Sequence, residues 1–299
     1  MVLEQIAARP AKLLSVLRQE FGLSSGLVKR LKWQDALFVN DAPAHTDARV
    51  LPGDRVRVVI RESPEGFDPE PMALSVLYED EAILAVDKPS GMLVHPSPQK
   101  NSGTLANGVL YYLQQNGEDA GVHPVTRLDR DTFGVVLLAK NANIHDRFCR
   151  MLREKQLQKT YLAAVFGGPA DEEGEIDLPV YKVGDGSLIR TVDARGQEAH
   201  THYRLLCRAD GVSILALHPL TGRTHQLRLH CMASGFPILG DPQYTTDAAR
   251  AYSDARGLFT QQLCAAKLEF CHPMTGEPVT ICTKQEIFLP EGLGKLPII

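Results

Sequence analysis

The order of apolar and polar positions predicts a small group of elements at the N-terminus. Apolar residues at helical spacing over 13–21 and 24–32 predict two short helices, with Gly22 ending the first. Strict alternation over 55–60 predicts a strand, and a short apolar run at 36–39 predicts a second strand. Two helices followed by a small hairpin therefore occupy the first sixty or so residues.

Beyond residue 75 the pattern changes to many strands with helices between them. The predicted strands cover 76–78, 82–87, 135–139, 159–166, 201–207, 212–218, 265–271 and 279–282, and the predicted helices cover 107–113, 141–155 and 225–234. Because strands and helices do not alternate strictly, we expect an α+β fold with a mainly antiparallel mixed sheet and flanking helices. Residues 169–200 are rich in Gly and Asp and predict a surface excursion, and a polar loop is expected before Ala265.

The stretch Glu62–Pro71 predicts a connection between two domains. It holds three prolines among acidic residues, a composition typical of a stiff, exposed linker. A chain of 299 residues is also long for a single core. We expect an N-terminal domain over 1–61, a linker over 62–75 and a larger domain over 76–299.

Composition narrows the class of protein. The chain is 44% hydrophobic and 23% charged, as in ordinary soluble globular proteins. No apolar run approaches the roughly 20 residues that span a bilayer, and the N-terminus lacks the features of a secretion signal. The six cysteines are scattered without a Cys-x-x-Cys pair, which argues against a zinc site and a disulfide framework. We expect a cytoplasmic monomer without membrane association.

Charge is distributed unevenly along the chain. Residues 1–61 hold ten Lys or Arg against six Asp or Glu, whereas the whole chain has a net charge of −4. A basic segment on an acidic body indicates a polyanion partner. Lys29, Arg30 and Lys32 lie on the outward side of the second predicted helix and are candidate phosphate contacts. A solvated helix face is the competing interpretation.

The stretch Val125–Lys140 combines a polar loop with a buried strand. Residues 126–132 are densely charged, residues 135–139 are continuously apolar, and Gly134 marks a sharp turn or a close approach. A loop carried by a buried strand is a rigid support for a catalytic side chain, and Asp129 is the central candidate. A surface turn whose charges pair with one another is the alternative.

A second polar stretch, Gly222–His230, lies at the start of a predicted helix, with Thr224 as the expected cap. Backbone N–H groups at a helix N-terminus favour an anion, which is either a phosphate or a carboxylate. Arg223 could therefore pair with Asp129, orient it and keep it ionised, as a carboxylate nucleophile requires. From spacing alone, an ordinary surface arginine remains the alternative.

These stretches together resemble a known family. Residues 126–140 resemble the signature of RluA-type pseudouridine synthases, which is usually His-Arg-Leu-Asp followed by Thr-Ser-Gly and an apolar run. Further stretches agree in order and spacing: 87–96, 159–163, 222–230, 235–241 and 263–276. Residues 10–61 resemble the alpha-L RNA-binding module of ribosomal proteins, which often precedes this domain in the family.

The resemblance implies isomerisation of uridine to pseudouridine in RNA, with ribosomal RNA as the first choice of substrate and transfer RNA as the second. It implies no cofactor and no metal. Asp129 matches the catalytic aspartate, Tyr161 the tyrosine that stacks on the base and assists removal of the C5 proton, and Arg223 the arginine that pairs with the aspartate. Further candidate contacts to the substrate are Arg127, Thr126, His225, Gln226 and Arg228.

Three positions depart from the family pattern. Thr126 and Cys264 stand where His is usual, and Phe133 replaces a small Ser. We expect Thr126 to alter how the loop inserts into RNA, and Phe133 to add bulk beside it, with effects on target choice and rate. The alternatives are a non-catalytic RNA-binding or ribosome assembly protein of the same fold, and a carboxylate-dependent hydrolase of nucleosides or sugars. The hydrolase lacks a clear second carboxylate, because Asp131 is too close in sequence to be assumed one.

Overall fold

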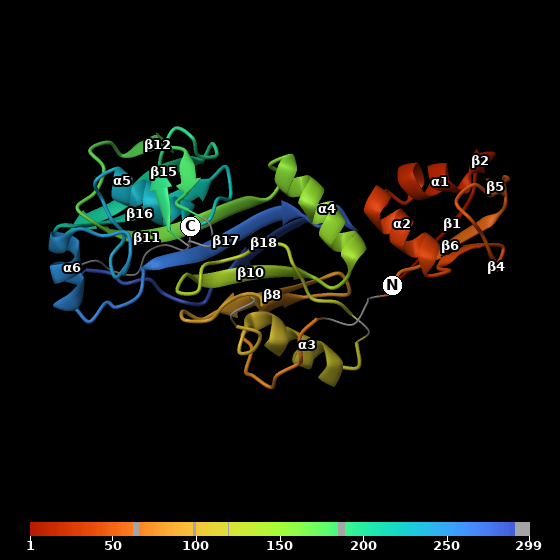
Figure 1. Ribbon diagram of the computed structural model, residues 1–299, viewed down its shortest axis with the longest axis horizontal. Helices are drawn as coiled ribbons and strands as arrows, with labels where there is room; N and C mark the ends of the chain where they lie inside the picture. The colour runs from red at the N-terminus through yellow and green to blue at the C-terminus, as the bar shows by residue number, and fades with distance from the viewer. Residues whose placement is uncertain (62–65, 98–99, 119, 185–188, 291–299) are drawn as a thin grey trace.

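The computed structural model describes residues 1–61, 66–97, 100–118, 120–184 and 189–290. A small N-terminal unit, red to orange in Figure 1, lies beside helix α4 (Ala142–Arg153) of a larger body. Within the described ranges, no helix is long and apolar enough to cross a membrane.

The N-terminal unit has its own sheets and helices. One sheet has the order β1 (Val2–Ile6), β6 (Arg55–Val59), β3 (Leu37–Val39) and β4 (Ala42–Pro43), and β2 (Ala11–Lys12) pairs with β5 (Arg49–Val50). Helix α1 (Leu13–Ser15) continues as a π-helical turn, η1 (Val16–Glu20), and α2 (Ser25–Trp33) follows. The Ser24 side chain caps α2 by accepting from Leu27 N. The predicted helices and strands are confirmed, whereas β1, β2, β4 and β5 were not predicted.

The core of this unit is separate from that of the body. Its buried residues include Leu13, Leu17, Leu31, Val50 and Val58. The unit contacts α4 through a hydrogen bond from Ser24 to Asp146. Arg147 Nη2 also donates to Phe21 O, and Arg150 Nη2 to Gly22 O, both at 3.3 Å. These two arginines therefore satisfy carbonyls at the C-terminal end of η1.

The body is built on a ten-stranded sheet. Its main path runs β12 (Glu173–Asp177), β15 (His200–Ala209), β16 (Val212–Pro219), β11 (Gln158–Phe166), β17 (Leu263–Cys271), β10 (Phe133–Ala139), β8 (Ile83–Lys88) and β7 (Val76–Glu79). Strand β18 (Pro278–Cys282) pairs with β17, and β9 (His123–Pro124) with β10. Only the β10–β17 pair among these is parallel. The expected mainly antiparallel α+β fold is confirmed.

Strand β10 is buried on both faces, as its apolar run predicts. Val136 and Leu138 pack in the same core as α3 (Leu105–Gln115), whereas Val135 and Leu137 pack with α4. In Figure 1 these two helices flank the sheet near β8 and β10. The body is completed by α5 (Gln226–Ala233) and α6 (Asp247–Asp254).

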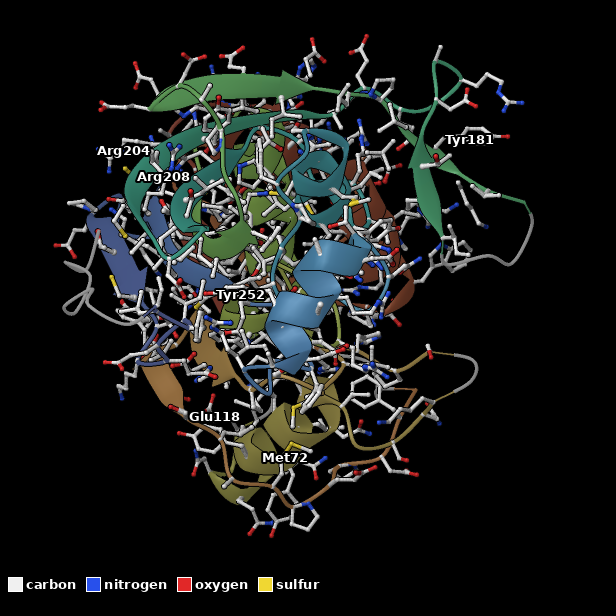
Figure 2. The ribbon with its side chains drawn as sticks, turned by 90° about the vertical axis from the view of Figure 1, so that its left-hand side faces the viewer. Met72, Glu118, Tyr181, Arg204, Arg208 and Tyr252 are labelled. Atoms are coloured by element: carbon white, nitrogen blue, oxygen red, sulfur yellow. The ribbon has the colours of Figure 1, made fainter. Side chains whose placement is uncertain are left out.

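The predicted surface excursion and the predicted polar loop both contain regular structure. Within 169–200, β12 extends the edge of the main sheet, and β13 (Val180–Lys182) pairs with β14 (Arg190–Val192) as an arm that carries Tyr181 away from the body (Figure 2). The expected polar loop contains α6, which Thr246 caps by accepting from Ala249 N. The predicted polar loop is wrong where α6 forms, whereas the predicted surface excursion at 169–200 contains strands that were not predicted.

The connection between the two parts is exposed only in part. Glu62 to Glu65 lie outside the described residues. Asp68 and Pro69 are exposed, as predicted, but Phe67 is buried with its ring 5.3 Å from that of His95. Met72 packs closely over Gly108 of α3, and Figure 2 shows Met72 beside this helix. An exposed linker is therefore wrong for Phe67, because an aromatic side chain gains by burial in the adjacent core.

Candidate active site

Strand pairing brings the polar loop at 126–132 next to Tyr161. Gly134 and Tyr161 both pair with Ala265 of β17, from opposite sides. Gly134 has φ +107, and a Cβ there would lie 2.4 Å from Ala265 O. The expected close approach at Gly134 is confirmed, and the residue allows the loop carrying Asp129 to enter the sheet beside Tyr161.

Asp129 is paired with an arginine at the centre of this site. Its side chain is 27% exposed, and Oδ2 accepts from Arg228 Nη1 at 3.1 Å. Asp241, whose side chain is fully buried, accepts from Nε and Nη2 of the same guanidinium at 2.7 and 3.0 Å. Burial opposes the charge of Arg228, but hydrogen bonds and the charges of Asp241 and Asp129 raise its pKa above the usual value. Arg228 is thus a permanently charged link between two carboxylates.

Asp241 and Tyr244 fix this arginine in place. Asp241 Oδ1 accepts from the backbone N–H groups of Gln243 and Tyr244 at 2.9 Å. The guanidinium carbon of Arg228 lies 5.0 Å from the centre of the Tyr244 ring, within the range of a cation–π contact. Neither residue was predicted as functional. In the sequence, this part of the site was indicated only by the stretch 235–241, which resembles the family and ends at Asp241.

The predicted pair between Arg223 and Asp129 is wrong. Arg223 is exposed and donates from Nε to Glu198 O at 3.1 Å. The helix begins at Gln226 rather than after a Thr224 cap, and the preceding His225 has a left-handed backbone with φ +58. Arg223 therefore lies in the turn before the helix, whereas Arg228 lies in its first turn and reaches Asp129.

Two further predicted substrate contacts, Gln226 and Thr126, have hydrogen-bond partners within the fold. Gln226 is buried, with Nε2 donating to His200 O and Thr201 Oγ1 at 3.0 Å. Thr126 is also buried, and its Oγ1 accepts from Leu137 N at 3.0 Å. These polar atoms thus satisfy buried groups of the fold, and contact of the two residues with substrate stays a prediction. Thr126 joins the polar loop to β10.

His225 and Arg127 remain open to a substrate. His225 is half-buried and its Nδ1 lies 3.0 Å from the Tyr244 hydroxyl. Burial lowers the pKa of His225, an effect that the charge of Asp129 partly offsets and that of Arg228 reinforces. Arg127 is exposed, two positions before Asp129. His225 is therefore a neutral hydrogen-bonding group near pH 7, and Arg127 is an exposed cation of the loop, as is Arg130.

Tyr161 supplies an aromatic surface near Asp129. Its side chain is half-buried and packs against the core that contains Ala265. Burial raises the pKa of Tyr161, and the charge of Asp129 raises it further. The residue therefore keeps its phenolic proton at neutral pH.

Lys88 lies beneath the loop and was not predicted as functional. It is fully buried, and Nζ donates to Pro89 O, Met92 O and Arg130 O at 2.8–2.9 Å. Burial lowers its pKa to about 8, against the opposing charges of Asp131 and Asp129. A buried ammonium group thus ties the loop that carries Asp129 to the loop at 89–92.

The remaining charges of the loop pair with each other. Arg130 donates from Nε and Nη2 to the two carboxylate oxygens of Asp131, both at 2.8 Å. The alternative of surface pairing is therefore correct for this pair and not for Asp129. Among the described residues, no group of three or more His, Cys, Asp or Glu side chains could hold a metal ion.

Two of the departures from the family pattern form one packing contact. Phe133 and Cys264 are partners in the β10–β17 register, and both are buried in one core with Leu239 and Ile287. Burial raises the pKa of Cys264 to about 12. The expectation that Phe133 adds bulk beside the loop is wrong, because its ring lies in this core. A larger residue at 133 is accommodated opposite a smaller one at 264.

Known proteins share this sequence and fold. A family model described as RNA pseudouridylate synthase matches residues 82–233. An uncharacterized RNA pseudouridine synthase of Bacillus subtilis is 37% identical over 263 residues, which cover 86% of this chain and 83% of that protein. The ribosomal large subunit pseudouridine synthase D of Neisseria meningitidis is 33% identical, covering 83% of this chain and 68% of that protein. The chain belongs to the RNA pseudouridylate synthase family.

The solved structures agree with this assignment. The human RNA pseudouridylate synthase domain containing 1 superposes with a TM-score of 0.58 at 27% identity, covering 72% of this chain and 86% of that one. The RluA-type resemblance is confirmed, and the chain is an RNA pseudouridine synthase, an isomerase.

Proposed function

We propose that this pseudouridine synthase isomerises specific uridines of structured RNA through Asp129, with ribosomal RNA as the first substrate to test and transfer RNA as the second. The observation that carries the proposal is the paired carboxylate: Asp129 is held by Arg228 at 3.1 Å, with Tyr161 beside it. The name of the relative from Neisseria meningitidis supports ribosomal RNA.

The reaction needs a negative group next to the sugar. The C1′–N1 bond breaks, uracil turns, and C5 bonds to C1′; C5 then loses a proton and N1 gains one. As C1′ gives up its bond to N1, positive charge develops on the sugar, which a carboxylate can stabilise or trap by forming a bond. Arg228 fixes the direction of the Asp129 carboxylate for either role.

Tyr161 serves in this scheme as the surface on which the base stacks. An aromatic ring in a partly buried site retains uracil after the glycosidic bond has broken. Because its pKa is raised, Tyr161 is not available as a phenolate at neutral pH. It can accept the C5 proton only if its own proton leaves in the same step.

The spacing of the two parts favours a large substrate. Asp129 lies before the start of β10, whereas α4, which contacts the N-terminal unit, follows the end of that strand. Seven strand residues span about 23 Å. A substrate that reaches both parts is therefore a folded RNA rather than a nucleoside. The target uridine must then leave its stack, at a cost of a few kcal/mol that phosphate contacts can offset.

We infer that residues 1–61 are the RNA-binding module, that 62–75 connect it, and that 76–299 form the catalytic domain. Lys29 and Lys32 are exposed on α2, which suits them to phosphate contacts. Arg30 was expected on the same outward side, but its Nε and Nη2 are buried. We further propose that the enzyme acts as a monomer in the cytoplasm. The six cysteines, all free, are compatible with a reducing compartment.

A hydrolase of nucleosides or sugars is less well supported. It would need a protonated carboxylic acid to assist the leaving group. Asp131 is bound by Arg130, and Asp241 by Arg228, so both carboxylates are engaged by cations. A non-catalytic assembly protein of the same fold would not need the Asp129–Arg228 pair.

The proposal is tested by mapping pseudouridines in ribosomal and transfer RNA of cells with and without the gene. Wild type and Asp129→Asn are then each expressed in the deletion strain. We expect a specific site to disappear on deletion, to return with wild type and to stay absent with Asp129→Asn. No altered site in any RNA would support the assembly protein, and release of free uracil from RNA would support the hydrolase.

A further inference from the structure

Trp33 is the most exposed large apolar residue in the part of the chain that the structure describes. It is the only tryptophan of the chain, and 78% of its surface is accessible. It is the last residue of α2, whose buried face consists of Leu27, Val28 and Leu31. A single exposed apolar residue is ordinary by itself, so the surroundings of Trp33 decide what it means.

The surroundings are cationic. On a helix, Lys29 and Arg30 lie four and three positions before Trp33 and so share its side, and Lys32 precedes it directly. Lys29 and Lys32 are exposed, and α2 contains no acidic residue. The nearest acidic residue in sequence is the exposed Asp35, beyond the helix end. An aromatic ring among lysines fits a ligand that offers both phosphates and flat π faces.

The position of Trp33 separates it from the contact between the two parts of the molecule. The N-cap of α2, Ser24, bonds to Asp146 of α4. Trp33 lies at the other end of the helix, eight residues or about 12 Å along the axis from Ser25. The ring is thus presented by a helix that the body holds at its far end.

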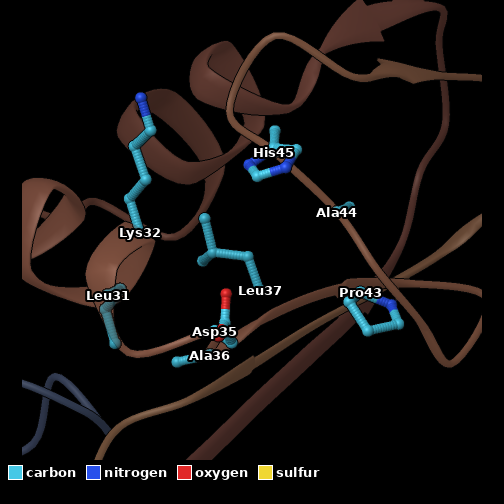
Figure 3. A pocket seen from close by; sticks show the side chains of 8 residues that line it. All are labelled: Leu31, Lys32, Asp35, Ala36, Leu37, Pro43, Ala44 and His45. Carbon is cyan, nitrogen blue, oxygen red and sulfur yellow. The ribbon is translucent and has the colours of Figure 1, made fainter.

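A small cavity near this helix end does not compete for the ligand. It measures about 60 Å³ and is lined by residues of α2, β3 and the following loop, among them Lys32, Asp35 and His45 (Figure 3). This volume has room for a few water molecules. A base would therefore lie on the surface, on Trp33, rather than enter the cavity.

We propose that Trp33 stacks on an unpaired base of the RNA substrate, next to phosphates bound by Lys29 and Lys32. Bases inside a duplex are covered on both faces, so this contact selects a loop, a bulge or a single-stranded end. The inference rests on the proposed RNA-binding role of residues 1–61 and adds a second unpaired nucleotide, distant from the uridine that enters the catalytic site.

The test uses the full-length protein and two synthetic RNAs, a hairpin with a loop of unpaired bases and a blunt duplex of the same length. Because Trp33 is the only tryptophan, its fluorescence reports on this position alone. We expect the hairpin to quench the emission and the duplex to leave it nearly unchanged. Equal quenching by both RNAs, or by neither, would overturn the proposal.

Affinity measurements separate stacking from charge. We expect Trp33→Ala to weaken hairpin binding about tenfold without changing its salt dependence, and Trp33→Phe to restore much of the loss. The double variant Lys29→Ala/Lys32→Ala should lower the slope of log affinity against log salt by about 1.4. Leu51→Ala, which truncates another exposed apolar residue of the same module, is the matched control and should bind like wild type.

The outcomes distinguish this inference from the function on which it rests. If the lysine variant loses affinity while Trp33→Ala does not, stacking is wrong and the RNA-binding module stands. If neither variant changes affinity, the module does not bind RNA and both fail. A loss with Leu51→Ala equal to that with Trp33→Ala would show a general disturbance of the module and would also overturn stacking.

Discussion

Arg228 Nη1 donates to Asp129 Oδ2 at 3.1 Å, although the two residues are 99 positions apart. Arg228→Lys keeps the positive charge but cannot bind both Asp129 and Asp241 in the same geometry. We expect pseudouridine formation by the purified variant to fall about 100-fold, because the carboxylate is no longer oriented.

Arg223→Lys is the matched control for this prediction, since Arg223 lies in the same stretch and bonds to a backbone carbonyl. Its activity should stay within about threefold of wild type. Both variants are to be assayed on the same RNA after their melting temperatures have been measured. A larger loss with Arg223→Lys than with Arg228→Lys would show that the structural pair is not the functional one.

The choice between these two arginines shows what the sequence could not supply. Both lie within six residues at the start of one helix, and spacing alone does not say where that helix begins. The left-handed backbone of His225 sets the start, and non-glycine residues seldom adopt it, so no pattern predicts it. By contrast, the continuous apolar run at 135–139 predicted a strand buried on both faces, because each face packs under a helix.

Buried polar groups account for the other differences between the predicted site and the structure. Gln226 and Thr126 are polar residues in the two stretches predicted to form the site. Their hydrogen-bond partners are atoms of the chain that come together only in the fold. Lys88 is a charged residue that hydropathy places on the surface, and its three carbonyl partners lie in two separate loops. Helix α6 could have been found from Thr246 and the helix-forming residues after it.

Asp241 should contribute to stability as well as to the position of Arg228. Asp241→Asn removes a fully buried charge and leaves Arg228 with a weaker partner. Breaking a buried pair costs on the order of 3–5 kcal/mol. We expect urea denaturation to show a loss in that range, together with reduced activity under folding conditions.

The exposed pair between Arg256 and Asp210 is the control for burial. Its N–O distance is also 2.7 Å, but its side chains are 35% and 57% exposed. Asp210→Asn should therefore cost less than about 1 kcal/mol. Similar losses for the two variants would contradict a special role for the buried pair.

Lys88 should make the stability of the protein depend on alkaline pH. Burial lowers its pKa from 10.5 to about 8, so between these values the unfolded chain binds more protons than the folded one. The folded state then gains stability as pH rises, by up to about 3 kcal/mol. Lys88→Met lacks this contribution and leaves three carbonyls without their donor, so it should be less stable at every pH.

The measurement is urea denaturation of wild type and Lys88→Met at several pH values from 7 to 10.5. Groups other than Lys88 titrate in both proteins, and the difference in free energy of unfolding isolates this residue. We expect the difference to grow above pH 8. A difference that stays constant with pH would contradict the lowered pKa, and full activity of Lys88→Met would contradict its role in holding the loop.

Gly134 should tolerate no side chain. A Cβ at this position would lie 2.4 Å from Ala265 O and 2.8 Å from Ala265 N, and both atoms belong to a central strand that cannot move aside. Gly134→Ala also forces alanine to φ +107, a backbone conformation that costs on the order of 1–2 kcal/mol by itself.

Gly53→Ala is the matched control, because Gly53 has φ +92 with nothing within 4 Å of a Cβ built there. We expect Gly53→Ala to lose only that backbone cost in thermal denaturation, and Gly134→Ala to lose more than about 4 kcal/mol or fail to fold. Equal losses would mean that the strand crossing at Ala265 is wider than the structure places it, and that the loop carrying Asp129 is not held by this contact.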